Sequence, residues 1–187
     1  MNPHFHHWLL HGQAQALSFM KRYAAAAQVY RQAVDLEPGD IKAWRNMGFL
    51  HAVLKQPDAA ISAFRRTLAL APQDTNTRFN LGYVLHEEKR YEEAIREFES
   101  VIQAAPKHDR AWYGMGLCRM ETGGMEEAIA ALKEAAKLQY FNPHAAYHLA
   151  LAYHRLGRHD ELRAEYHRVN SFDPKCGERI RQETGLT

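Results

Sequence analysis

Small and large apolar residues recur at fixed steps along the chain, and the step is 34 residues. Five consecutive units of this length each carry a small residue in the eighth place: Ala14, Gly48, Gly82, Gly116 and Ala150. The twentieth residue is small in four of the five units, and the twenty-fourth is always large and apolar or aromatic. Small residues let two helices approach closely, and a large residue fills the space beside them. The pattern therefore predicts pairs of closely packed helices.

Turn signals divide each unit in the middle and separate it from the next. Lys, Gly and other turn residues follow the first predicted helix of each unit, as in Lys55-Gln56-Pro57 and Gly123-Gly124-Met125. Pro38, Pro72 and Pro106 are 34 residues apart, and proline cannot continue a helix. We therefore expect an all-α chain with about eleven helices and no strand. The predicted repeats are 7–40, 41–74, 75–108, 109–142 and 143–176, followed by a C-terminal cap, 177–187, with a short helix over 177–184.

This pattern resembles the tetratricopeptide repeat (TPR) family over about nine-tenths of the chain. Repeat two carries the family residues Trp44, Met47, Gly48, Ala60, Phe64 and Pro72, and repeat three carries Leu81, Gly82, Tyr91, Ala94, Phe98 and Pro106. The resemblance implies one domain, 1–187, folded as a right-handed α-solenoid of five helix-turn-helix repeats. It also implies that the first helices line a concave groove that binds peptides. The local departures from the family pattern are Arg78, His51, Arg119, Leu162 and the segment 140–143.

The composition narrows the possible functions. Lys and Arg number 24 against 22 Asp and Glu, a net charge of +2, which argues against a dedicated nucleic-acid binder. No run of 18 apolar residues predicts a membrane span, and no basic residue precedes an apolar stretch at the N-terminus, so we expect no secretory signal. The two cysteines, Cys118 and Cys176, lie far apart and form no CxxC motif. We therefore expect a reduced, cytoplasmic protein.

Polar and aromatic residues gather on the face of the first helices opposite the predicted core. Cations, amides and aromatic rings together suit recognition of a peptide with acidic and apolar side chains. The candidate peptide-binding residues are Lys42, Arg45, Asn46, Phe49, Asn76, Phe79, Asn80, Tyr83, Arg110, Tyr113, Tyr147 and His148. The alternative is that these aromatics pack against neighbouring repeats and that the amides bind local backbone.

Some TPR co-chaperones bind a chaperone tail through a two-carboxylate clamp, and this resemblance can be tested residue by residue. Arg45, Asn80 and Arg110 match the clamp pattern approximately, whereas Phe49 and Gly114 do not. The clamp is incomplete, so we expect a different acidic or amphipathic segment as the ligand.

The sequence contains few motifs that indicate metal binding or catalysis. His7 and His11, like His144 and His148, have the i, i+4 spacing of a metal-binding pair, but no cysteine or carboxylate stands in an obvious third position. We therefore expect neither a metal nor another cofactor. Cys118 is predicted to be a packed core residue. The sequence contains no GxSxG, P-loop, GxGxxG or HExxH motif, so we expect no enzyme.

The leading hypothesis is a non-catalytic interaction module: an adaptor, co-chaperone or assembly factor that holds a partner segment in its groove. The alternative is a scaffold that self-associates through its terminal surfaces, because Phe5, Trp8 and Leu9 make the N-terminal end apolar. A third hypothesis, RNA binding by a helical repeat, is disfavoured by the balanced charge. We predict protein partners, with no nucleic acid and no membrane insertion.

Overall fold

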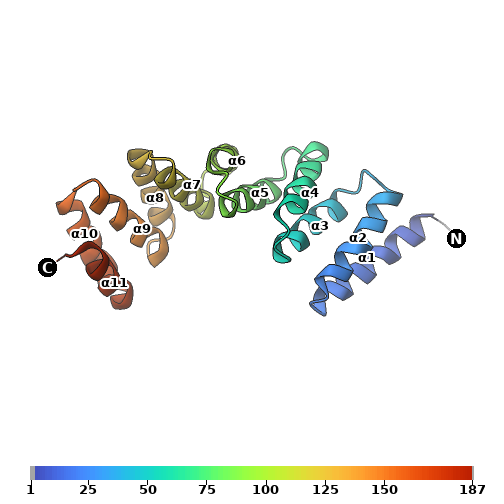
Figure 1. Cartoon of the computed structure of the whole chain (residues 1–187), viewed down its shortest axis with the longest axis horizontal. Helices are drawn as coiled ribbons and strands as arrows, with labels where there is room; N and C mark the ends of the chain where they lie inside the picture. The colour runs from blue at the N-terminus through green and yellow to red at the C-terminus, as the bar shows by residue number, and fades with distance from the viewer. Residues whose placement is uncertain (1–2, 187) are drawn as a thin grey trace. The chain divides into compact units, whose positions relative to one another are not determined.

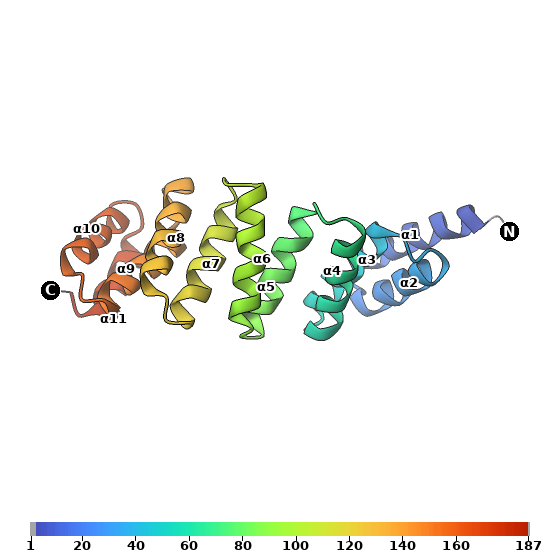
Figure 2. The same cartoon turned by 90° about the horizontal axis from the view of Figure 1, so that it is seen from above.

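The computed structural model describes residues 3–186, and within them the chain forms eleven α-helices and no strand. The helices follow one another in pairs joined by short turns (Figures 1 and 2). Their bounds are α1 (Pro3–Phe19), α2 (Tyr23–Leu36), α3 (Ile41–Val53), α4 (Pro57–Leu70), α5 (Thr75–Glu87), α6 (Tyr91–Ala104), α7 (Asp109–Glu121), α8 (Met125–Leu138), α9 (Pro143–Arg155), α10 (His159–Asn170) and α11 (Pro174–Thr184). The predicted all-α TPR fold is confirmed.

The helices fall into two compact units, residues 1–90 with α1–α5 and residues 91–187 with α6–α11. Within each unit, helices that are adjacent in sequence pack against each other. The core of the first unit is formed mainly by α1–α3, around Leu10, Tyr30 and Met47, and that of the second by α8–α11, around Leu132, Leu149 and Ile180. Each unit therefore has a hydrophobic core of its own.

The repeated small residues allow close contact between the two helices of a pair. A Cβ atom added at Gly48 would lie 2.5 Å from Cδ1 of Phe64, and one added at Gly116 would lie 2.7 Å from Cγ of Leu132. Phe64 and Leu132 are both fully buried. The eighth and twenty-fourth residues of a repeat are thus direct packing partners, as the pattern predicts.

A capping side chain starts α3, α5, α7 and α9, and in each case it is the last residue of the preceding repeat. Asp40, Asp74, His108 and Asn142 each accept a hydrogen bond from a backbone N–H in the first turn of the helix that follows. Such a bond satisfies one of the donors that the start of a helix leaves without a partner. A capping side chain therefore recurs every 34 residues, at positions 40, 74, 108 and 142.

One departure from the family pattern, Arg78, keeps a hydrogen bond that two tryptophans make in other repeats of this chain. Nε1 of Trp44 and of Trp112 donates to the carbonyl oxygen of the proline six residues earlier, at 3.0 and 2.9 Å. Arg78 stands in the same place of repeat three, and its Nη2 donates to the carbonyl oxygen of Pro72 at 2.8 Å. The arginine therefore replaces the indole without loss of this contact between helix and connector.

The predicted start of the C-terminal helix is wrong by three residues. The repeat register predicts a helix over 177–184, whereas α11 begins at Pro174, directly after its cap Asp173. The Oδ1 atom of Asp173 accepts from the N–H of Cys176 at 3.0 Å. Proline is well suited to the first turn of a helix, where its missing N–H costs nothing, so here it begins a helix instead of following one.

At the N-terminus, α1 begins at Pro3, one turn before the first predicted repeat. The proposed N-cap, Asn2, lies outside the described residues. Within residues 3–186, no helix is both long and apolar enough to cross a lipid bilayer.

Candidate functional site

Two aromatic rings stand in equivalent places on the first helices of repeats two and three. Phe49 of α3 is 54% exposed and Tyr83 of α5 is 53% exposed, although both belong to well-packed helices. Lys42 and Asn76, also in equivalent places near the starts of these helices, are exposed as well. Because α3 and α5 contact each other, the first unit presents cationic, amide and aromatic groups on adjacent helices.

The side chains of Arg45 and Asn46 bind other residues of the first unit. Nη1 of Arg45 lies 3.2 Å from Oδ2 of Asp74, and the arginine side chain is 41% exposed. Nδ2 of Asn46 donates to the hydroxyl oxygen of Tyr30 at 2.9 Å. Burial raises the pKa of this tyrosine above its usual value, and the bond from Asn46 opposes that rise. Arg45 therefore links α3 to the start of α5, and Asn46 links α3 to α2.

The remaining predicted residues of the first unit, Phe79 and Asn80 of α5, are half-buried. Phe79 contacts other residues of the chain. The outward part of the face therefore consists of Lys42, Phe49, Asn76 and Tyr83. We call these four residues the α3/α5 face.

In the second unit, part of the predicted groove is covered by the chain itself. Tyr147 of α9 is only 7% exposed, its hydroxyl donates to Glu183 of α11 at 2.5 Å, and the guanidinium of Arg179 lies 4.1 Å from its ring centroid. The sequence predicts Tyr147 on an open groove. The structure corrects this, because α11 packs against α9 at this place.

Two further residues of the predicted groove, Tyr113 and His148, lie close to each other in the second unit. His148 of α9 is half-buried, and its ring centroid is 5.7 Å from that of Tyr113 in α7. Burial, reinforced by nearby Arg179, lowers the pKa of His148 to about 4. His148 is therefore neutral at physiological pH. Arg110 of α7 is exposed. Of the predicted residues in this unit, Arg110 is the most exposed to solvent.

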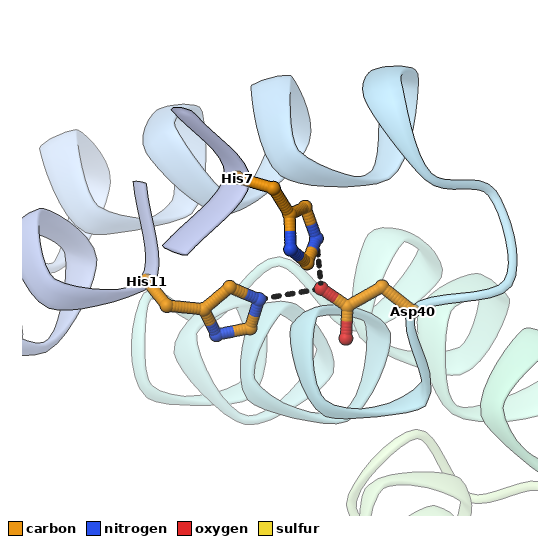
Figure 3. Close-up of side chains that lie close together, drawn as sticks. All are labelled: His7, His11 and Asp40. Carbon is orange, nitrogen blue, oxygen red and sulfur yellow. Dashed lines mark hydrogen bonds and ion pairs between the residues drawn. The ribbon is translucent and has the colours of Figure 1, made fainter. Parts of the chain in front are cut away.

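A cluster of metal-ligating side chains lies where α1 meets the start of α3. Nε2 of His7 and Nε2 of His11 lie 2.8 and 2.5 Å from the same atom, Oδ2 of Asp40 (Figure 3). The three potential ligand atoms all lie within 4.8 Å of one another. The sequence predicts no third ligand for this histidine pair, and that prediction is wrong.

Asp40 does not stand out beside the histidine pair in the sequence, because it lies 29 residues beyond His11. The repeat register contained the signal: the fifth residue of a repeat meets the last one, since Arg45 contacts Asp74 in the same way. The other pair, His144 and His148, belongs to no such three-residue group among residues 3–186.

The cysteines are single thiols. Cys118 is fully buried, as predicted, and burial raises its pKa to about 12. Cys176 is half-buried, and burial raises its pKa as well. A thiol that holds its proton so firmly is a poor nucleophile at neutral pH, so these side chains serve packing.

Several solved structures are similar to this chain, and three illustrate the likeness. The "MamA RS-1 ArsTM double mutant" is 24% identical with a TM-score of 0.87, and the match covers 91% of this chain and 96% of that one. MamA 41-end from Desulfovibrio magneticus RS-1 has the same identity and coverages, with a TM-score of 0.86. YrrB, described as a TPR protein with an unusual peptide-binding site, is 16% identical with a TM-score of 0.81, covering 90% of this chain and 88% of its own. These likenesses show the fold.

No curated protein matches the chain. Residues 3–169 match the family model of the Cilia and flagella-associated protein 70 C-terminal domain. Because this match spans most of the sequence, and because the repeats carry the TPR residues and packing described above, the chain belongs to this family of TPR domains.

Proposed function

We propose that the protein is a non-catalytic interaction module that holds an extended segment of a partner protein on the α3/α5 face. The observation that carries the proposal is the pair of half-exposed rings, Phe49 and Tyr83, in equivalent places on adjacent helices. Exposed aromatic rings supply rigid apolar area at low cost in side-chain entropy, and such residues dominate binding energies in protein interfaces. Adjacent repeats present them at regular spacing, as an extended ligand requires.

The charge of this face indicates the chemistry of the partner. Lys42 is an exposed cation, and Asn76 offers an amide that both donates and accepts hydrogen bonds. A segment with an acidic side chain for Lys42 and apolar side chains for the two rings complements these groups. YrrB, a protein of the same fold, is described as having a peptide-binding site, which supports this class of ligand.

The cellular role that fits is that of an adaptor, co-chaperone or assembly factor. No cofactor enters this function. We place the protein in the cytoplasm, because its two cysteines are both free thiols and one of them is fully buried.

The test compares two pairs of aromatic substitutions. A partner captured from native lysate is mapped to a segment, and its affinity is measured by isothermal titration calorimetry. Phe49→Ala with Tyr83→Ala should weaken binding by at least about tenfold, the effect of removing interface hot spots. The matched control, Trp8→Ala with Phe19→Ala, removes two exposed rings of α1 and should leave the affinity unchanged. Wild-type affinity in the folded Phe49/Tyr83 variant would refute the α3/α5 face as the site.

A second candidate function, self-association as a scaffold, is favoured by the surface of α1. Trp8 is 66% exposed, Phe19 is 91% exposed, and the ring of Phe5 stacks on Trp8 at a centroid distance of 6.0 Å. Exposed apolar patches of this kind often mark protein interfaces. Light scattering at several concentrations discriminates between the candidates. A mass that rises with concentration, and falls to the monomer in Trp8→Glu, supports the scaffold.

A further inference from the structure

We propose that His7, His11 and Asp40 form a binding site for a divalent transition-metal ion, with Zn²⁺ as the ion of choice. The site is independent of the α3/α5 face and of any partner bound there. It joins the first helix of repeat one to the start of repeat two, inside the first unit. Figure 3 shows both imidazole rings of α1 directed at the carboxylate that begins α3.

The positions of the three ligand side chains are already restrained by the surrounding structure. His7 and His11 are one helical turn apart on α1, so their side chains leave the helix on the same face. Asp40 is held by its other oxygen, because Oδ1 accepts the N–H of Ala43 at 2.9 Å. The ring of His11 packs edge-on against Tyr30, with centroids 5.6 Å apart. A carboxylate held by its cap and an imidazole held by packing lose little freedom when a metal binds.

The donor set selects the metal. Two imidazole nitrogens and one carboxylate oxygen suit Zn²⁺ and neighbouring first-row ions, whereas Mg²⁺ and Ca²⁺ prefer sites built from oxygen. Zinc bonds of about 2.0–2.1 Å in a tetrahedron separate ligand atoms by about 3.3 Å. The present nitrogen-to-oxygen distances of 2.8 and 2.5 Å need to widen by less than 1 Å, which small rotations of the rings supply.

The site has room for a fourth ligand. Oε2 of Glu37 lies 3.4 Å from Nε2 of His7, and the Glu37 side chain is 58% exposed. The ligand histidines are half-buried, at 20% and 16% side-chain exposure, and Asp40 is at 7%. The three inner ligands are thus shielded, while Glu37 beside them is exposed, so Glu37 or water can supply a fourth ligand.

Helix capping alone does not account for this arrangement. The cap uses Oδ1 of Asp40, whereas the two histidines converge on Oδ2. The second repeat joins its helices at the equivalent place with one arginine, Arg45, and a purely structural contact needs no more. Two imidazole nitrogens and one carboxylate oxygen instead lie within 4.8 Å of one another, close enough for one ion to bind all three.

The experiment titrates Zn²⁺ into tag-free protein by calorimetry. All proteins carry His4→Gln and His6→Gln, which remove other histidines near the N-terminus. The proposal predicts one ion per chain and a rise in melting temperature, because an ion that binds only the native state stabilises it. Co²⁺ should give the intense visible absorption of four-coordinate cobalt.

Two variants locate the site. Asp40→Asn removes the carboxylate and keeps a good N-cap, and it should weaken Zn²⁺ binding by at least about 10–100-fold, the loss seen when even supporting residues of metal sites are changed. His7→Gln with His11→Gln should abolish the binding. The matched control, His144→Gln with His154→Gln, removes two exposed histidines of α9 and should bind as the starting protein does.

Three results would overturn the proposal. The first is wild-type affinity in Asp40→Asn. The second is a weak, six-coordinate cobalt spectrum in the starting protein. The third is binding that the control abolishes. If the double histidine variant does not fold, as judged by circular dichroism, then Asp40→Asn and the cobalt spectrum decide the question.

Discussion

Arg45 of α3 and Asp74, the cap of α5, form an ion pair with Nη1 and Oδ2 3.2 Å apart, in the same repeat positions as His11 and Asp40. The carboxylate therefore serves two purposes: it starts a helix, and it binds that helix to the preceding repeat. This finding removes Arg45 from the residues suited to probing a partner. Arg45→Glu would place two negative charges together and destabilise the junction itself.

Asp74 should contribute more as a cap than as an ion-pair partner. It accepts from the N–H and the hydroxyl of Thr77 at 3.0 and 2.9 Å, and its ion pair with Arg45 is partly solvated. Asp74→Ala is expected to lower the free energy of unfolding by about 1–2 kcal/mol. Asp74→Asn keeps the cap and should cost less than about 1 kcal/mol. Urea denaturation measures both, and equal losses would contradict this division.

Because Asp74 is ionisable, its contribution to the stability of the fold should depend on pH. Burial alone would raise the pKa of Asp74, but hydrogen bonds from Thr77 and the charge of Arg45 bring it below its usual value. A carboxyl group with a lowered folded-state pKa stabilises the fold above its unfolded-state pKa, and that contribution is lost as the pH falls through the folded value. The stability difference between wild type and Asp74→Asn should therefore shrink in strong acid.

Gly48→Ala should destabilise the protein, against the usual helix preference for alanine. The new Cβ would meet the ring of buried Phe64, and overpacking of this kind costs about 1–3 kcal/mol. Gly12→Ala is the matched control: Gly12 is an exposed glycine of α1 with no neighbouring atom within 4 Å of the added Cβ. It should stabilise by about 0.5–1 kcal/mol. Thermal denaturation should thus shift in opposite directions, and shifts of the same sign would contradict the close contact.

The turn inside each repeat offers a stabilising substitution. Lys21, Lys55 and Lys89 have φ of 57°, while Gly123 and Gly157 occupy the same place in repeats four and five at 85° and 68°. Glycine reaches this left-handed conformation without the penalty that a side chain brings.

Lys55→Gly should therefore raise the free energy of unfolding by about 0.5–1 kcal/mol. Lys133→Gly, in the middle of α8, should lower it by about 1 kcal/mol, because glycine is unfavourable inside a helix. Denaturant titration of both variants checks the prediction. A loss of stability in Lys55→Gly would show that the lysine side chain contributes more than its backbone conformation costs.

Because His148 is half-buried as a neutral ring, mild acidification should destabilise the fold. Burial lowers its pKa in the folded state to about 4, below the ordinary value of 6.5. Between these values the unfolded chain binds more protons, so stability falls as the pH drops from about 6.5 to 4, by on the order of 2–3 kcal/mol. His148→Gln should lose this part of the pH dependence. An NMR titration of the His148 ring with a midpoint near 6.5 would contradict the prediction.

The repeats were predictable from the sequence because packing imposes them locally. Gly48 and Phe64 touch, so both residue types recur with the repeat, and the caps that close each repeat follow the same spacing. The start of α11 was not predictable in this way. Pro174 has the same place in its repeat as the connector prolines Pro38, Pro72 and Pro106, but the cap Asp173 directly before it favours the start of a helix.

The surface exposure of the candidate site residues was predictable only where it follows the repeat. Exposure of Phe49 and Tyr83 follows from their places on the first helices, whereas burial of Tyr147 depends on α11, which belongs to no complete repeat. The contact between His11 and Asp40 is periodic, but it links the first helix of one repeat to the last residue of that repeat, so it emerges only when both positions are compared.

The four caps that close the repeats differ in how they respond to protons. Asp40 and Asp74 stop accepting hydrogen bonds through a charged oxygen once they are protonated, and His108 can no longer accept the N–H of Ala111 at Nδ1 when its ring takes up a second proton. The amide of Asn142 does not titrate. Acid should therefore fray the starts of α3, α5 and α7, while the start of α9 keeps its cap. At low pH, amide hydrogens in the first turns of α3, α5 and α7 should exchange faster than those in the first turn of α9.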